Sequence, residues 1–599
     1  MVKDQDKYLA ADLIADFLEE KKIDIVFGII GSANSYIFDS IQNKKYTKVI
    51  YVHHEQAAVM SAGAYFRTNG KLSAAIVTAG GGSANAFTGA LCNWADSIPC
   101  IIISGQESSK YMQQHANLRM QGTQGFFITE SVKNIVKKTT LISEKNQILH
   151  SLEEAYHLCL DGRPGPVWVD IPMDMQSSIL NKQDLIRYKI STKEKLTNFD
   201  LISDIGNLIK NSKRPVIMAG HGIKLSNSEN NFKQLIDKLK IPVLLTWSGI
   251  DILPYDHLFN FGCSGVYGQR CANFIVQNCD LLIVVGSRLA IPQTGYNINQ
   301  FAPHAKIVMI NNDENELKKH SRYDIKFNID CKLFIDKLSN LDIDSNHESW
   351  HKRCLQYKSD FPIIEQCHID DNKKYNNSYV LINNLSDFLD EDHVVVIGQG
   401  TPLPCCHQSL KIKEKQKVFA SNGLGEMGNG LPSAIGAAFA AKGKNVILLD
   451  GDGSMMMNLQ ELQTIVGYNL PIKIIIFNNE GYLFIKHTQK MLFNGRYTGV
   501  NAETGVSMPK FEKIANAFGI SYFNTKRNTI KEFLSCNGAA IYECFMNPEQ
   551  DLVPKVKGIL QKNQILPPPL EEMSPLLPID VIEQNMIIPV NEISYNIRK

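Results

Sequence analysis

Two short polar motifs, GDGS at residues 451–454 and NN at residues 478–479, each follow a run of apolar residues. The runs at residues 446–449 and 474–477 predict neighbouring buried strands of a parallel sheet, whose carboxyl ends share one edge. Glycines let backbone N–H groups approach an anion, and a carboxylate beside them can hold a hard cation that bridges it. The pattern therefore predicts a diphosphate–Mg²⁺ site.

Three residues of these motifs can bind the metal. Asp452 and Asn479 offer side-chain oxygens, and Gly481 offers a backbone carbonyl. A bare GDG is more often a tight turn with an exposed aspartate, but its spacing from the second motif favours the metal site.

Composition excludes several classes of protein. With 62 Lys and Arg against 61 Asp and Glu, the formal charge is +1, which does not favour nucleic acid as a partner. Apolar runs are far shorter than the ~18 residues of a membrane span. The charged, helix-patterned N-terminus does not resemble a signal peptide, so we expect a cytoplasmic protein. The 13 cysteines contain no CxxC pair, and we expect mostly buried thiols.

Strand-like runs alternate with helical patterns in three series, which predicts an α/β fold of three doubly wound parallel-sheet domains. Polar stretches near 180–195 and 345–375 separate the series. We expect domains at residues 1–182, 195–345 and 375–555. Residues 556–599 include the proline-dense LPPPLEEMSPLLP and predict an extended arm on the surface.

The GDGS and NN motifs resemble the cofactor signature of thiamine diphosphate enzymes. YVHHEQAAVMSAGAYFRTNG and VTAGGGSANAFTGALCNWADSIPCIIISGQ are similar to the pyrimidine-binding domain of acetolactate synthase, and SNGLGEMGNGLPSAIGAAFA to a loop and helix of that family. The resemblance covers about residues 8–550. It implies thiamine diphosphate and Mg²⁺ as cofactors, an N-terminal pyrimidine-binding domain, a central Rossmann-like domain and a C-terminal diphosphate-binding domain. It also implies a homodimer or homotetramer with the site between subunits.

The resemblance also assigns roles to residues. Glu55 would hydrogen-bond the cofactor's pyrimidine ring, although alone it reads better as a helix-capping carboxylate. Gln124 would orient the substrate, although alone it reads as a solvated loop amide. Met427 would wedge beneath the cofactor, or else fill a gap in the core. The remaining expected cofactor contacts are Gly31, Thr78, Gln399, Gly425, Gly453, Ser454 and Asn479.

The substrate pocket departs from the family pattern. Thr488 stands where the family has a tryptophan that narrows the acceptor pocket, and Phe484 replaces a methionine. Ser32 replaces a loop glycine, and Met173 replaces a channel lysine. Lys486 or His487 could meet a polar acceptor, or belong to a solvated face.

The changes favour a side-branch carboligase. It would join the acyl unit of a 2-oxo acid, pyruvate in the first instance, to a ketone, aldehyde or sugar acceptor. The alternatives are a non-ligating 2-oxo acid decarboxylase or aldehyde lyase on the same fold, and a binding protein that has lost catalysis.

The resemblance leaves FAD open. Arg163, Gly220, Gly222 and Arg288 match contact positions of the family's flavin. The Asp-Arg pair expected after Arg288 is instead Ile291-Pro292, which removes two charges.

Overall fold

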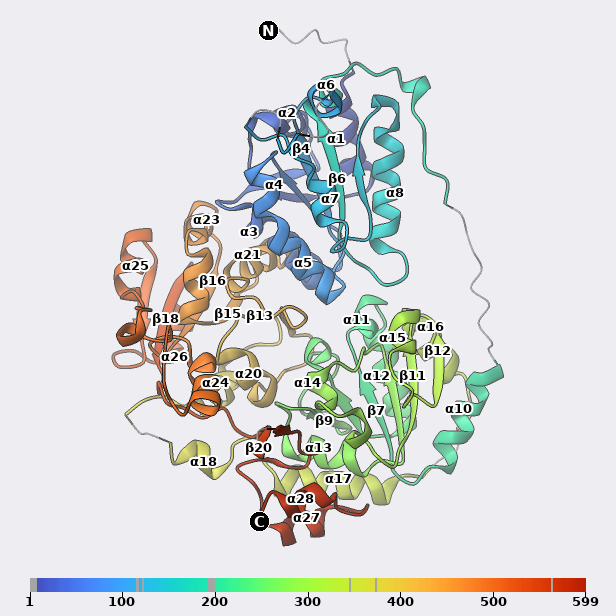
Figure 1. Cartoon of the computed structure of the whole chain (residues 1–599), viewed down its shortest axis with the longest axis vertical. Coiled ribbons are helices and arrows are strands. Elements are labelled where there is room, and N and C mark those ends of the chain that lie inside the picture. Colours follow the sequence, from blue (N-terminus) through green and yellow to red (C-terminus); the bar gives the residue numbers. More distant parts are fainter. Residues whose placement is uncertain are drawn as a thin grey trace. The chain divides into compact units, whose positions relative to one another are not determined.

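The computed structural model describes residues 8–114, 118–120, 123–190, 200–343, 346–371, 374–561 and 564–598. The chain forms two compact units. Unit 1 comprises residues 1–193, 393–400 and 419–544, and unit 2 comprises residues 194–392, 401–418 and 545–599. Three six-stranded sheets carry the architecture, which confirms the predicted α/β class (Figure 1). Among the described residues, every helix is too short or too polar to cross a membrane.

The first sheet lies in unit 1 and has the order β2-β1-β3-β4-β6-β5, with every pair parallel. Its central strands consist mainly of Ala, Ile and Val buried on both faces, as parallel strands between two helical layers require. The strands are β1 (Ile25–Gly28), β2 (Lys48–Tyr51), β3 (Ala74–Val77), β4 (Ile101–Gln106), β5 (Thr139–Leu141) and β6 (Val167–Pro172). The main helices are α1 (Ala10–Glu20), α2 (Ser35–Gln42), α3 (Glu55–Asn69), α4 (Gly81–Asn85), α5 (Phe87–Asp96), α8 (Ile148–Leu160) and α9 (Met173–Gln176).

The third sheet has the order β14-β13-β15-β16-β18-β17, the same relative order as the first. The pairs β13–β15, β15–β16 and β17–β18 are parallel. Its strands are β13 (Val394–Ile397), β14 (Lys417–Ala420), β15 (Val446–Gly451), β16 (Ile472–Asn478), β17 (Ser521–Asn524) and β18 (Ala540–Phe545). The helices of this part include α21 (Gly430–Ala440), α22 (Asp452–Met455), α23 (Glu461–Gly467), α24 (Leu483–Phe493), α25 (Phe511–Phe518) and α26 (Ile530–Ser535).

Helix α3 packs against α21 and joins the two sheets of unit 1 into one apolar core. Both helices are rich in Ala, Gly and Ser, so their backbones can approach closely. A Cβ on Gly436 would lie 2.1 Å from the Ser61 carbonyl oxygen, and the Ser61 hydroxyl donates to the Pro432 carbonyl at 2.8 Å. Small residues at these positions are therefore a packing requirement.

The central sheet lies in unit 2 and has the order β12-β11-β10-β7-β8-β9, the Rossmann order. Its given pairs are all parallel. The strands are β7 (Pro215–Ala219), β8 (Val243–Leu245), β9 (Asn260–Cys263), β10 (Leu281–Val285), β11 (Lys306–Asn311) and β12 (Ile325–Asn328). The helices of unit 2 include α10 (Asp200–Asn211), α11 (Gly222–Leu225), α12 (Glu229–Leu239), α13 (Arg270–Asn278), α16 (Cys331–Ser339), α17 (Glu348–Asp360), α19 (Ser378–Leu385) and α20 (Pro402–Ser409).

The C-terminal segment is not the extended surface arm that its prolines suggested. It forms β19 (Lys555–Val556), β20 (Ile559–Gln561), β21 (Gln564–Leu566), β22 (Met573–Ser574), α27 (Ile579–Asn585) and α28 (Glu592–Asn596). Leu570, Met573 and Ile582 are buried in the core of unit 2. The prediction failed because Pro578 directly precedes α27, where a missing N–H group costs nothing.

The cysteines follow the sequence prediction. All 13 are free thiols, and all except Cys367 and Cys536 are buried. The exact domain boundaries drawn from the sequence stay a prediction.

Candidate functional site

The first part of the candidate site lies at the carboxyl ends of β1 and β3. In the order β2-β1-β3, the chain leaves these two strands toward opposite sides, and ligands of open α/β sheets bind at such a switch point. Gly31 and Ser32 follow β1, and Thr78 follows β3 directly. A Cβ on Gly31 would lie 2.5 Å from Thr78 Oγ1, so the two predicted contacts Gly31 and Thr78 touch.

Glu55 is the first residue of α3 and is 8% exposed. Its Oε2 accepts a hydrogen bond from the Asn85 side chain at 3.0 Å. A Cβ on Gly82 would lie 3.0 Å from Glu55 Oε1 and 2.6 Å from Thr78 Cγ2. The glycine therefore lets the carboxyl group and Thr78 lie side by side. Thr78 Oγ1 is buried without a hydrogen-bond partner, which leaves one polar atom here for a ligand.

Gln124 belongs to the same edge. Its Cβ and Cα lie 2.8 and 2.9 Å from the position of a Cβ on Gly80, whose φ is +63°. Position 80 requires glycine for two reasons: its positive φ disfavours other residues, and a side chain there would overlap Gln124. The structure thus brings Glu55, Thr78, Gly31 and Gln124 together around the glycine-rich turn that follows β3.

The second part of the site lies at the carboxyl ends of β13 and β15, the switch point of the third sheet. Asp452 is 2% exposed, and its two carboxylate oxygens accept the N–H groups of Gly453 at 2.8 Å and Gly481 at 3.0 Å. Gly481 has φ +142°, and a Cβ there would lie 2.0 Å from the Val500 carbonyl oxygen. The buried Asn479 follows β16. The three predicted metal ligands therefore share one edge.

Burial raises the pKa of Asp452 to about 7, against the lowering effect of the backbone N–H groups that it accepts. Asp450, two residues earlier, is also fully buried, and burial raises its pKa to about 7. It accepts the N–H groups of Gln399 at 3.0 Å and Gly451 at 2.9 Å. A divalent cation bound at Asp452 would favour the ionised form of this carboxylate.

The other predicted contacts surround this edge. Gln399 is buried and donates from Nε2 to the Ser421 carbonyl at 3.2 Å. Gly425 has φ +71°, and the nearest atom to a Cβ there is Gln399 Oε1 at 3.8 Å, so the space beside it is open. The Ser454 hydroxyl accepts the N–H of Gly428 at 3.0 Å, which fixes the end of the loop that carries the half-buried Met427.

Gly453 also has a packing partner. A Cβ at Gly453 would lie 2.3 Å from the Tyr482 ring. Packing against Tyr482 is enough to explain a glycine at this position, so the glycine by itself is no evidence for the predicted contact with the cofactor.

The predicted substrate-pocket residues are spread over three elements. Ser32 begins the short helix at residues 32–34 and is exposed, and Met173 begins α9. Phe484 is half-buried on α24, and the exposed Thr488 donates its hydroxyl to the Phe484 carbonyl at 3.1 Å. Lys486 Nζ lies 5.5 Å from the centre of the Tyr497 ring. The structure brings Phe484 and Thr488 together, while their link to a substrate stays a prediction.

The predicted flavin contacts divide between the two units. Arg163 is in unit 1, where its Nε donates to the Ser97 hydroxyl at 2.8 Å, whereas Gly220, Gly222 and Arg288 are in unit 2. A Cβ on Gly220 would lie 2.5 Å from the Gly286 carbonyl oxygen, and one on Gly222 would lie 2.7 Å from Gly286 Cα. Close backbone packing alone explains these glycines.

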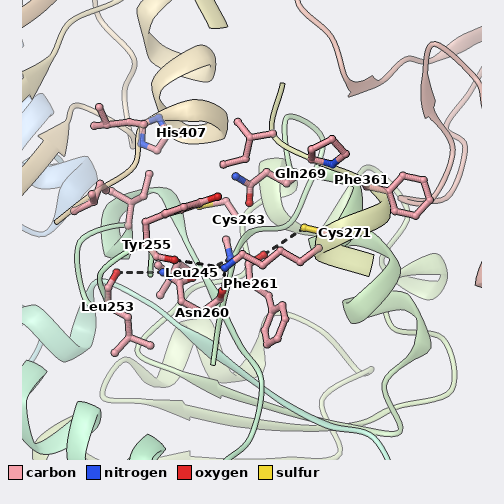
Figure 2. A pocket seen from close by; sticks show the side chains of 17 residues that line it. Leu245, Leu253, Tyr255, Asn260, Phe261, Cys263, Gln269, Cys271, Phe361 and His407 are labelled. Carbon is pink, nitrogen blue, oxygen red and sulfur yellow. Dashed lines mark hydrogen bonds between the residues drawn. The ribbon is translucent and has the colours of Figure 1, made fainter. Parts of the chain in front are cut away.

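Unit 2 also contains a cavity of about 120 Å³ beside β9 (Figure 2). Its lining is largely apolar, including Phe261 and Phe361, and it contains none of the predicted site residues. The Lys358 ammonium at its wall donates to the backbone carbonyls of Tyr255 and Asn260 at 3.4 and 3.0 Å. The cavity therefore does not offer the predicted chemistry.

Sequence reasoning missed several residues that support the site. Asn85 donates to Glu55, and Asp450 accepts the N–H of Gln399. Gly80 and Gly82 make room for Gln124 and Glu55. Asp450 directly precedes the GDGS motif, and the two glycines belong to the VTAGGGSAN segment already quoted, so their proximity to these motifs was the available signal. Nothing in the sequence pairs Asn85 with Glu55.

Comparison with known proteins matches three family models in order. These are the N-terminal thiamine pyrophosphate (TPP) binding domain at residues 9–125, the central domain of thiamine pyrophosphate enzymes at 202–338, and their C-terminal TPP binding domain at 398–544. The chain is 30% identical over 555 residues to the large subunit of acetolactate synthase isozyme 1 from Escherichia coli, covering 92% of this chain and 96% of the relative.

The chain belongs to the acetolactate synthase large-subunit family of thiamine diphosphate enzymes. Other relatives include the acetolactate synthase large subunit of Porphyra purpurea, 31% identical over 89% of this chain and 90% of the relative. The probable acetolactate synthase large subunit of Methanocaldococcus jannaschii is 31% identical over 85% and 86% of the two chains. The predicted family is confirmed, and the protein is a thiamine diphosphate-dependent enzyme with carboligase activity.

Proposed function

We propose that this acetolactate synthase-family enzyme decarboxylates a 2-oxo acid, with pyruvate as donor, and joins the acyl unit to a second carbonyl compound. The observation that carries the proposal is the pair of switch points in unit 1. One gathers Asp452, Gly453 and Gly481, and the other gathers Glu55, Thr78 and Gln124. When bound, thiamine diphosphate supplies the carbon centre that takes up the 2-oxo acid and stores the electrons released with CO₂.

The residues present fit the cofactor with Mg²⁺. Asp452, Asn479 and the Gly481 carbonyl would hold the metal, because carboxylate, amide and carbonyl oxygens suit a hard cation. The open space beside Gly425 and the unpartnered Thr78 hydroxyl would accept the organic group.

Glu55 would hold a proton at the pyrimidine nitrogen and so help to create the base that the reaction needs. Gln124 would orient the substrate carboxylate. Met427 would fix the bent form of the cofactor, and the apolar surroundings of both edges would exclude water.

We propose a homodimer or larger assembly as the active form, on the basis of family membership. A test is to mix an Asp452→Ala variant with a Glu55→Gln variant, each inactive alone. Turnover that appears on mixing supports a site shared between subunits, because one of the hybrid's sites then carries neither substitution. Absence of turnover in hybrids verified by mass spectrometry would contradict it.

FAD is a second cofactor that we include in the proposal, with Arg163 and Arg288 as the contacts to test. The glycines Gly220 and Gly222 do not add support, because packing against Gly286 accounts for them. The absorbance spectrum of the purified protein decides whether flavin is bound.

The acceptor is proposed to differ from a second pyruvate, because Thr488 and Phe484 stand where the family has tryptophan and methionine. Carbon NMR of the protein with thiamine diphosphate, Mg²⁺ and labelled pyruvate, with and without aldehyde, ketone and sugar acceptors, tests this directly. Product that forms only with an added acceptor supports the proposal. Acetolactate from pyruvate alone would contradict the altered acceptor, and free acetaldehyde alone would contradict carboligation.

A further inference from the structure

Asp170 is a fully buried carboxylate of the first sheet, on the strand next to the edge strand β5. It stands on β6 and is 0% exposed, and its partners are on the neighbouring strand β4. The Ser104 hydroxyl donates to Oδ1 at 2.5 Å, and Gln106 Nε2 donates to Oδ2 at 2.9 Å. Burying a carboxylate is costly even when it is hydrogen-bonded, and an apolar residue often serves stability equally well. The sheet itself does not require this group.

Gln106 connects this carboxylate to a loop. Its Oε1 accepts the N–H of Glu107 at 2.9 Å, and its Nε2 donates both to Asp170 and to the Phe126 carbonyl, also at 2.9 Å. One end of the amide therefore meets a donor and the other meets two acceptors, which fixes its orientation. Gln106 is 1% exposed, so water does not compete for these bonds.

The loop held in this way carries Gln124. Phe126 donates its N–H to the Gln124 carbonyl at 3.1 Å, so the two residues form one tight turn. From the other side, Gly80 packs against Gln124 Cα and Cβ. The turn thus lies between a glycine surface and the Gln106 amide.

We propose that Gln106, oriented by Asp170, is a positioning residue that sets where Gln124 meets the substrate. The inference rests on the proposed function, in which Gln124 contacts the substrate. The Asp170 carboxylate accepts one N–H of the Gln106 amide and so turns the other toward the Phe126 carbonyl.

A double variant that exchanges the amide of Gln106 with the carboxyl group of Asp170 distinguishes a role in positioning Gln124 from a role in the stability of the sheet. In Gln106→Glu with Asp170→Asn, the amide introduced at position 170 can donate to the new carboxylate, and the Ser104 and Glu107 bonds are kept. The carboxylate at position 106, ionised at pH 8, has no proton to donate to the Phe126 carbonyl. The link between β4 and β6 is therefore restored while the link to the loop is not.

The expected result for Gln106→Leu is a fall in kcat/KM for pyruvate of about 100-fold, because small misplacements of positioning groups cost this much. Thiamine diphosphate affinity should change far less, because the metal ligands proposed at Asp452, Asn479 and Gly481 belong to the third sheet and keep their contacts. The double variant should regain part of the melting temperature lost in Gln106→Leu, because the Phe126 carbonyl stays unpaired, and it should keep the loss in kcat/KM. Recovery of kcat/KM together with the melting temperature would overturn the proposal.

Ser40→Ala is the matched control. Its hydroxyl is buried and donates to the Asp12 carboxylate at 2.8 Å, in the same sheet's helical layer and outside the chain of hydrogen bonds from Asp170 to Phe126. It should lower stability without changing kcat/KM. An equal loss of kcat/KM in this control would show that any buried polar bond here matters, and would overturn the assignment.

Hydrogen exchange without substrate separates this proposal from the proposed function. Backbone amides of residues 123–128 should exchange at least about 10-fold faster in Gln106→Leu and in the double variant, and at the wild-type rate in Ser40→Ala. If the wild type does not consume pyruvate, the proposed function fails, and the exchange data still decide the positioning role. Unchanged exchange in Gln106→Leu would overturn it.

Discussion

The first and third sheets of unit 1 have the same relative strand order but carry different chemistry at their switch points. The third sheet presents two buried aspartates, Asp450 and Asp452, whose bonds run to backbone N–H groups. The first presents Glu55, Thr78 and Gln124, packed on glycines. In the proposed function, one frame is used twice: the third sheet would bind a charged group, and the first would hold hydrogen-bonding groups against a substrate.

The central sheet of unit 2 shows what such an edge looks like without this chemistry. Gly220, Gly222 and Gly286 lie at its switch point, but they pack backbone against backbone. Three glycines at the switch point of the first sheet instead pack against side chains: Gly31 and Gly82 against Thr78, and Gly80 against Gln124. The two switch points therefore differ in what their glycines make room for: backbone in the central sheet, and candidate site side chains in the first.

The largest effect is expected at the third sheet. Asp452→Ala removes a buried carboxylate that would bind the metal, so Mg²⁺-dependent affinity for thiamine diphosphate should fall by at least about 100-fold in titration calorimetry. The control Asp24→Asn changes a carboxylate that accepts from Tyr65 and lies at neither switch point. Equal affinities of Asp452→Ala and wild type would contradict the role given to this edge.

Glycine substitutions sharpen the contrast between the first and central sheets. Gly222→Ala and Gly31→Ala should each lower the free energy of unfolding by about 1–3 kcal/mol through overpacking. Only Gly31→Ala should also lower kcat, because only its neighbour Thr78 belongs to the candidate site. Gly467→Ala is the control, since a Cβ there meets no atom within 4 Å. If Gly222→Ala, compared with Gly31→Ala at equal stability, also loses kcat, the contrast between the two sheets is contradicted.

Thr488→Trp tests the acceptor pocket. Restoring the bulky side chain of the family should shift the ratio of product from pyruvate alone to product from a larger acceptor by roughly 10-fold, since shape differences in a pocket give modest discrimination. Carbon NMR of the competing products measures the ratio. An unchanged ratio would mean that α24 does not border the acceptor.

The pH should also change the stability of the first sheet. Burial raises the pKa of Asp170 to about 7, so the native state keeps a proton that the unfolded chain releases above about pH 4. The free energy of unfolding of the wild type should therefore fall as pH rises from about 4 to 7, more steeply than that of Asp170→Asn. Melting temperatures across this range check the slopes, and parallel curves would contradict the buried, proton-binding state.

Much of this arrangement could be predicted from the sequence. Buried strands that end in GDGS and NN place Asp452 and Asn479 on one edge, because parallel strands end together. The bonds that hold the site could not be predicted, since the pairs Asn85–Glu55 and Gln106–Phe126 depend on how loops fold over the sheet. The prediction for the proline-dense C-terminus was wrong because Ile579, Ile582 and Met586 have the spacing of one helix face, and the proline before them does not prevent that helix from forming.

The most direct test of the account is the exchange of the C2 proton of bound thiamine diphosphate, followed by NMR after quenching, in wild type and Glu55→Gln. The variant should bind the cofactor with nearly the wild-type Kd, because Asp452 and its edge are intact. Its exchange rate should fall by at least about 100-fold, the usual contribution of a positioned acid–base group. An unchanged exchange rate in a cofactor-loaded Glu55→Gln protein would contradict the division of roles between the two sheets.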